Sequence, residues 1–404
     1  MLYSQGIPLE QLGITSLDGR SCETDPRKIW KLFSQNYYLF RGTPTGVWLD
    51  FELHAVLDLK ERPDEYNSDK LYDEICEKLA SSEFLPRSLY ERFNIEFLAT
   101  TDSAIDSLNF HDMIIKSGWK GTVVPTFRPD TITDISNLQL WNSSIDTLAM
   151  ITDRTIDSFS DYLQAIKKQR QFFISRGATA TDHGVYQPYT GKLPGDEIEH
   201  IFNRARTGLI TTEDALKFTA HMLMEYAEMS LTDNLVMQIH PGCFRNHNYP
   251  LFEKFGADKG HDIPVSVEYT NNLRALLNTY GNNPELTIIL FTLDESTYNR
   301  ELAPLAGHYP ALKLGPAWWF NDSINGMTRF RQMTSETAGF YNTVGFNDDT
   351  RALLSIPARH DVSRRLDANY LGTLVAKKII SLEDAVEIAK DLTYSLVKKA
   401  YHVK

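Results

Sequence analysis

The chain has 404 residues, of which 42% are hydrophobic and 23% charged, a balance typical of a folded protein and unlike that of a disordered one. Its three cysteines, Cys22, Cys76 and Cys243, are few and far apart, which argues against a disulfide framework and favours a reducing, cytoplasmic location. The net charge of −12 and the lack of a basic block argue against nucleic acid as a partner. The sequence contains no apolar run of about 18 residues, the length needed to span a membrane.

The predicted elements begin with a helical layer. Residues 25 to 92 are rich in aromatic, charged and helix-favouring side chains. After this segment, short apolar runs alternate with stretches long enough to hold a helix, a pattern typical of parallel strands. Seven such runs can be counted, at 95–100, 122–127, 178–181, 235–239, 287–291, 311–314 and 343–346.

Two helices carry their own start signals. The segments 211–214 and 381–384 resemble capping boxes, in which a hydroxyl and a carboxylate three residues apart bond to each other's backbone N–H. Each precedes an amphipathic stretch, so we expect one helix before the run at 235–239 and another near the C-terminus.

Polar clusters follow nearly every apolar run. In a parallel barrel the carboxyl ends of the strands open onto one face, where active sites are built. Any single cluster is about as well explained by ordinary turn residues, but their succession favours a site. The clusters are 101–102, 128–130, 182–184, 240–245, 294–295, 318–322 and 348–351.

His240 ends a buried-strand pattern and stands before Pro241, where the strand must stop. Taken alone, such a histidine is as often a structural residue as an acid–base group. Arg245, in the loop that follows, favours a site. Asp182 has a comparable position after the run at 178–181. Arg128 follows the run at 122–127, and its planar guanidinium can bind a carboxylate through two parallel hydrogen bonds.

Asp349 and Arg351 are two residues apart and share a face if the backbone stays extended. One interpretation is a plain salt bridge. The other is a metal-binding carboxylate beside a cation that stabilises a developing oxyanion. Trp318 and Trp319 face opposite ways on an extended segment, so one can be buried while the other flanks a sugar ring.

Taken together, several long motifs resemble those of the uronate isomerase (glucuronate isomerase) family of the amidohydrolase superfamily. The resemblance implies a distorted (β/α)8 TIM barrel, with residues 1–92 as a helical insertion and 93–404 as the barrel with its C-terminal helix. It also implies interconversion of D-glucuronate with D-fructuronate and of D-galacturonate with D-tagaturonate. The motifs lie at 39–44, 48–50, 91–96, 128–130, 182–184, 240–248, 318–322 and 349–351.

The resemblance also implies roles for single residues. A divalent metal, with zinc expected, would bind Asp349, and the substrate would be a hexuronate. A homo-oligomer is expected. Which of Asp349 and Asp182 transfers protons, and which of Arg128 and Arg245 holds the uronate carboxylate, stays open. The implied catalytic residues are Asp349, Arg351, Asp182 and His240, and the implied substrate-binding residues are Arg128, Arg245, Trp318 and Trp319.

The chain departs from the family pattern at its beginning, because the first histidine is His54 and no His-x-His pair occurs. We therefore expect the first barrel strand to be missing, in line with the seven runs counted where a barrel needs eight. Either an upstream start supplies it, which we favour, or the chain is a natural truncation with an open edge. We expect the 404-residue chain alone to be inactive. Two alternatives are a metal-dependent hydrolase and an inactive sugar-acid-binding remnant.

Overall fold

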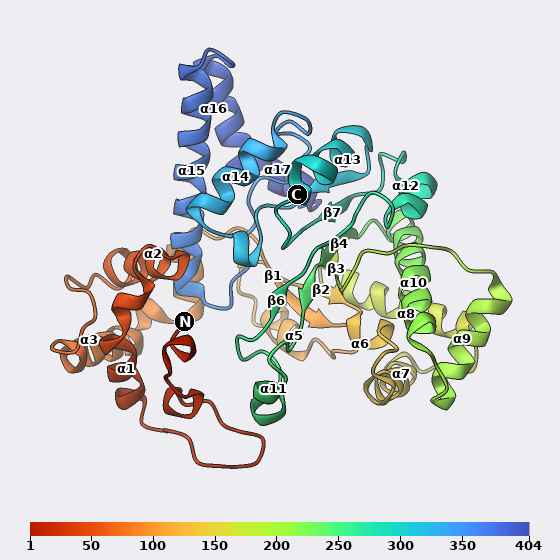
Figure 1. Ribbon diagram of the computed structural model, residues 1–404, viewed down its shortest axis with the longest axis horizontal. Helices are drawn as coiled ribbons and strands as arrows, with labels where there is room; N and C mark the ends of the chain where they lie inside the picture. Colours follow the sequence, from red (N-terminus) through yellow and green to blue (C-terminus); the bar gives the residue numbers. More distant parts are fainter. Residues whose placement is uncertain (404) are drawn as a thin grey trace.

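The computed structural model describes residues 1–403, and its centre is a parallel sheet surrounded by helices (Figure 1). Each strand pairs in parallel with the next one in the sheet, as expected where helices connect the strands. The α/β class and the parallel strands predicted from the sequence are confirmed. The sheet has six strands, in the order β1 (Leu98–Ser103), β2 (Val123–Arg128), β3 (Ala180–Val185), β4 (Val236–Pro241), β7 (Ile288–Leu290) and β8 (Leu312–Leu314).

The predicted strand at 343–346 is wrong, because this run makes only an isolated parallel bridge between Thr343 and Leu314. Val344 N–H donates to the Leu314 carbonyl at 2.9 Å, so the run continues the sheet for one step. Gly345 then takes a φ of +77°, outside the extended region that a strand requires. The sheet runs from β1 to β8 without closing on itself within residues 1–403, so a closed barrel is not established.

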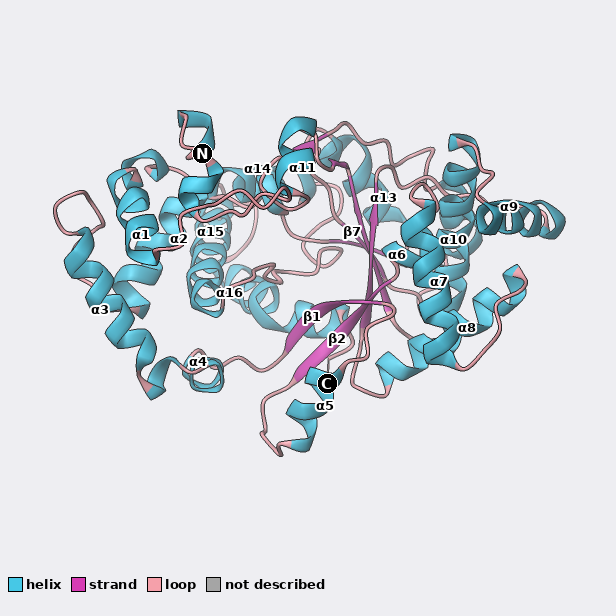
Figure 2. Ribbon diagram, turned by 90° about the horizontal axis from the view of Figure 1, so that it is seen from below, coloured by secondary structure: helices cyan, strands magenta, loops and turns pink. Residues whose placement is uncertain are grey.

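A two-stranded antiparallel ribbon, β5 (Cys243–Phe244) with β6 (Ile263–Pro264), follows the carboxyl end of β4. Figure 2 shows the sheet edge-on, with the helices of residues 26–92 and 356–390 on one side and those of residues 138–233 on the other. None of the helices in residues 1–403 is long and apolar enough to cross a membrane.

The helices of the first part of the chain are α1 (Pro26–Gln35), α2 (Pro44–Phe51), α3 (Ser68–Ala80), α4 (Pro86–Arg92), α5 (Asn109–Lys116), α6 (Asp130–Thr133), α7 (Leu138–Thr152), α8 (Phe159–Ile174), α9 (Gly195–Thr207) and α10 (Thr212–Asp233). Those of the second part are α11 (Tyr249–Phe255), α12 (Arg274–Tyr280), α13 (Ala303–His308), α14 (Ile324–Thr334), α15 (Ile356–Ala376), α16 (Leu382–Lys390) and α17 (Leu396–Ala400).

Both predicted capping boxes are present. The Thr211 hydroxyl accepts the Asp214 N–H at 3.1 Å, and the Asp214 carboxylate accepts the Thr211 N–H at 2.7 Å, which fixes the start of α10. Ser381 and Asp384 make the same pair of bonds at the start of α16.

The first four helices have a small core of their own, which supports the predicted helical layer. The last of them, α4, ends at Arg92, and β1 begins at Leu98. The division of the chain at residue 92 itself stays a prediction. This core contains Tyr37, Phe40, Leu53, Leu57, Leu59 and Leu71.

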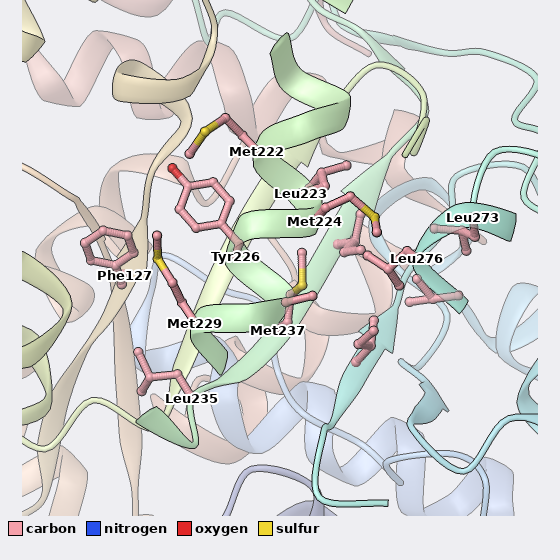
Figure 3. Close-up of a cluster of buried hydrophobic side chains, with 14 of the residues drawn as sticks. Phe127, Met222, Leu223, Met224, Tyr226, Met229, Leu235, Met237, Leu273 and Leu276 are labelled. Atoms are coloured by element: carbon pink, nitrogen blue, oxygen red, sulfur yellow. The ribbon is translucent and has the colours of Figure 1, made fainter. Parts of the chain in front are cut away.

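Side chains that alternate along the strands form two further hydrophobic clusters, one on each face of the sheet. On β4, Met237 and Ile239 face the covering helices, and Figure 3 shows Met237 in one cluster with Met222 and Met229 of α10. Val236 faces the other way, into an inner cluster with Ala180 of β3, Ile289 of β7 and neighbouring side chains. Because side chains alternate along a strand, Gln238 and His240, two and four positions after Val236, also face this inner side.

A buried ion pair joins α8 to α10 behind the sheet. The Arg170 side chain is fully buried and donates to both carboxylate oxygens of Asp233, at 2.6 and 2.9 Å, and to the Ser230 hydroxyl at 3.1 Å. A buried charge that loses its partner is strongly destabilising.

We therefore expect Arg170→Met to lower the free energy of unfolding by about 3 kcal/mol or more. Arg365→Met is the control, because the Arg365–Asp361 pair is exposed on α15 and should contribute less than about 1 kcal/mol. Urea denaturation measures both. Equal effects of the two substitutions would contradict this assignment.

Candidate active site

Asp182 and His240 meet at the carboxyl ends of two neighbouring strands. The register pairs Asp182 of β3 with Gln238 of β4, and Gly184 with His240, so both side chains face the inner side. The His240 Nδ1 lies 2.6 Å from Asp182 Oδ1, and the two side chains are only 14% and 10% exposed. The sequence prediction that these strand-end residues lie near each other is confirmed.

Arg128, at the end of β2, adds a third strand to this group. Its Nη1 donates to Asp182 Oδ2 at 3.1 Å, and its Nε donates to Asp130 Oδ2 at 2.8 Å. The other oxygen of Asp130 accepts the Gly184 N–H at 3.1 Å. A Cβ at Gly184 would lie 2.8 Å from the Asp130 carboxylate, so only glycine fits there without displacing it.

The charges of this group are set by their neighbours. Burial acts to raise the pKa of Asp182, but His240 and Arg128 outweigh it and lower that pKa to about 2. For Arg128, burial acts to lower the pKa, but the carboxylates of Asp130, Asp182 and Asp349 outweigh it and raise the pKa above its usual value. Asp182 is therefore a carboxylate and Arg128 a cation throughout the neutral range.

Aromatic rings hold the His240 imidazole in place. The Phe291 ring stacks on it with centroids 4.0 Å apart and planes inclined by 17°, and Trp318 meets it edge-on at 4.7 Å. The indole N–H of Trp318 donates to Asp349 Oδ2 at 3.0 Å. Asp349 is thus linked to the group through Trp318, although its own side chain is exposed.

The structure does not bring Arg351 into contact with Asp349. Arg351 is exposed and forms no ion pair or side-chain hydrogen bond with residues 1–403, so the plain salt bridge considered from the sequence is absent there. The segment from 347 to 350 is a loop and not an extended strand, which removes the basis for a shared face.

Arg245 and Trp319 form a separate rim. The Arg245 Nη1 donates to Asp262 Oδ2 at 2.8 Å, and its guanidinium lies 5.1 Å from the centre of the Trp319 ring. Both side chains are partly exposed, and neither has a direct contact with Asp182, His240 or Arg128. Trp318 is buried while Trp319 is exposed, which is the predicted outcome. The reason differs from the predicted one, because Trp319 begins a 3-10 helical turn at a φ of +45° and the two residues do not share an extended segment.

His183 has a structural role. Its Nε2 lies 2.9 Å from the Thr181 hydroxyl, and its ring packs 4.8 Å from Tyr226 of α10, on the helix side of the sheet. Burial lowers its pKa to about 3, so it stays neutral.

Arg359 was not singled out from the sequence, because it lies inside α15 with no strand-end signal. It pairs with Asp348 and Asp322 and lies 4.4 Å from the centre of the Trp48 ring. Burial raises the pKa of each of these two carboxyls to about 6, against the effect of Arg359. This cluster anchors the loop that carries Asp349 to the N-terminal helices.

A metal site is not complete within the described part of the chain. No group of three or more His, Cys, Asp or Glu side chains is arranged there to hold an ion. Asp349 has the Trp318 N–H as its hydrogen-bond donor and lacks companion ligands among residues 1–403. These residues alone therefore do not fit the divalent metal that the sequence resemblance implies.

Comparisons with known proteins agree with one another. The profile of a family described as glucuronate isomerase matches residues 17–401. A uronate isomerase of Rhizobium meliloti (strain 1021) is 53% identical over 403 residues, which cover 100% of this chain and 86% of the relative. The crystal structure of glucuronate isomerase from Caulobacter crescentus superposes with a TM-score of 0.97 at 50% identity, covering 100% of this chain and 84% of that one.

A more distant structure has the same architecture. Uronate isomerase from Thermotoga maritima gives a TM-score of 0.92 at 25% identity, over 99% of this chain and 86% of its own. These relatives do not favour the hydrolase or the inactive remnant considered from the sequence. The chain therefore belongs to the glucuronate isomerase family, and its activity is that of a uronate isomerase.

Proposed function

We propose that Asp182, His240 and Arg128 bind and isomerise D-glucuronate to D-fructuronate and D-galacturonate to D-tagaturonate. The close contact between the buried side chains of Asp182 and His240, with Arg128 on the other side of Asp182, carries the proposal. Aldose–ketose isomerisation moves a proton from C2 to C1 through an enediol. It needs a base, a group that stabilises the oxygen charge and a group that holds the uronate carboxylate.

In this scheme Arg128 holds the carboxylate. Its Nε and Nη1 are bonded to Asp130 and Asp182, which fix the plane of the guanidinium. The side chain is 32% exposed, so the remaining N–H groups are open to a ligand. A planar guanidinium is well suited to a carboxylate. Arg245, already bonded to Asp262, would line the outer part of the site with Trp319.

His240 and Asp182 are the proposed proton-transfer pair. The ionised Asp182 beside Nδ1 favours a proton on that nitrogen, which leaves Nε2 as the basic atom of the ring. The contact of the ring with Asp182 is made through Nδ1, so Nε2 would be the nitrogen available to a sugar hydroxyl. Asp349 would assist ring opening or the C2 proton transfer, and Arg351 would stabilise the enediolate.

Further parts of the proposal concern the surroundings of the site. We propose that the sheet belongs to a distorted (β/α)8 barrel of residues 93–404, with residues 1–92 as its helical cap. The protein is proposed to be a cytoplasmic homo-oligomer. Zinc, with Asp349 as one ligand, is proposed separately. Since the described residues do not complete its site, no step above passes through it.

The direct test is an assay of the purified chain with D-glucuronate and D-galacturonate, with ketose formation followed over time and metal content measured on the same sample. The sequence alone led us to expect an inactive chain, whereas its membership of the isomerase family leads us to expect ketose from at least one uronate. We expect no hydrolysis of a panel of esters and lactones. Hydrolysis without ketose formation would contradict the proposal.

Arg351→Met is expected to lower kcat by about 100-fold, because it removes a cation that stabilises developing oxygen charge. The melting temperature should not change, since the Arg351 side chain is exposed and unpaired within residues 1–403. Arg365→Met, also at an exposed arginine, is the control and should keep the parent kcat. Turnover of the Arg351→Met variant within about twofold of the parent would remove this residue from the mechanism.

A further inference from the structure

We propose that Tyr401, near the C-terminus, is a positioning residue of the active site, because its hydroxyl holds the Gln238 amide, which lies opposite Asp182 and one layer below His240. The inference rests on the proposed function and adds to it a residue that does not touch the substrate.

The C-terminal segment passes between the two ends of the sheet. It consists of a π-helical turn, η9 (Asp391–Ser395), followed by α17 (Leu396–Ala400). The Leu392 carbonyl packs directly on Gly345, where a Cβ would collide with it, so this segment lies against the last run of the sheet. Figure 1 shows the C-terminus close to the sheet, next to β7.

Contacts on the other side reach the start of β1. The Tyr394 hydroxyl donates to Glu96 Oε2 at 2.6 Å, and Lys398 pairs with the same carboxylate. His402 lies within 3.2 Å of the Asn234 carbonyl and 3.3 Å of the Thr287 hydroxyl, just before β4 and β7. The segment therefore lies under the amino-terminal ends of the strands, opposite the candidate active site.

From this position Tyr401 reaches into the interior of the sheet. Tyr401 and Ala400 pack against the inner cluster that contains Ala180 and Val236. The Tyr401 hydroxyl donates to Gln238 Oε1 at 2.8 Å, and Gln238 Nε2 donates to the Thr181 carbonyl at 3.3 Å. Burial, together with the charges of Asp182 and Asp349, raises the pKa of Tyr401, so the hydroxyl remains a donor.

Gln238 lies level with Asp182 on the neighbouring strand and one layer below His240. It is two residues before His240 on β4, and the register pairs it with Asp182 on β3. Its side chain is buried, so without Tyr401 its Oε1 would be an unpaired buried acceptor. An amide that turns to find another partner would change the polar surroundings of the Asp182 carboxylate and of the His240 ring beside it.

The test compares two variants that each remove one phenol hydroxyl from the same segment. Tyr401→Phe should lower kcat roughly five- to tenfold, as expected for one lost hydrogen bond in a buried network, with KM within about twofold. Tyr394→Phe is the matched control, because that hydroxyl bonds to Glu96 at the surface, and it should leave kcat unchanged.

A second readout does not depend on turnover. Long-range ¹H–¹⁵N NMR of the imidazole nitrogens, assigned with His240→Gln, reports the state of His240. Tyr401→Phe should shift the His240 signals, and Tyr394→Phe should not. Unchanged His240 signals in folded Tyr401→Phe would overturn the inference. If the unmodified chain forms no ketose, the proposed function fails, while these signals still decide the role of Tyr401.

A third variant separates positioning from packing. Gln238→Met removes the amide with little change in volume, and Tyr401→Phe added to it should cost no further loss of kcat, because the two residues act through one bond. Additive losses of kcat that follow the fall in melting temperature would overturn the inference, since they indicate that Tyr401 only packs the C-terminal segment.

Discussion

The buried carboxylate of Asp182, contacted by His240 on one side and Arg128 on the other, is the interaction on which the site depends. A carboxylate in this position is tolerated only where cations and donors surround it, because burying an unpaired charge costs several kcal/mol, on the order of 3–5 when a partner is removed. The two partners come from β4 and β2, on either side of β3. The register of three strands is therefore fixed by one charge as well as by apolar packing.

Successive side chains of a strand point to opposite faces of the sheet, and this alternation lets the buried Asp182 charge coexist with a stable fold. Met237 and Ile239 of β4 bury apolar surface against helices on one side, while Gln238 and His240 face the other. The proposed proton-transfer group His240 and its neighbour Gln238 thus occupy positions that are not needed for helix packing. The C-terminal segment completes the inner side from below, where Tyr401 meets Gln238.

Local sequence predicts those features that depend on local patterns. Apolar runs followed by polar residues predicted the positions of Arg128, Asp182 and His240, and spaced hydroxyl–carboxylate pairs predicted two helix starts. Features that depend on distant contacts were missed. The partner of Gln238 lies 163 residues away, and nothing around Tyr401 signals it. The run at 343–346 has strand-like composition, but its glycine leaves the extended region to make room for Leu392.

We propose that one hexuronate binds between Arg128, Asp182 and His240. A crystal structure of the chain with D-glucuronate would decide this. We expect the uronate carboxylate on the Arg128 guanidinium and a sugar hydroxyl within hydrogen-bonding distance, about 3 Å, of His240 Nε2. A sugar ordered elsewhere on the molecule, with these three side chains still bonded only to one another, would contradict it.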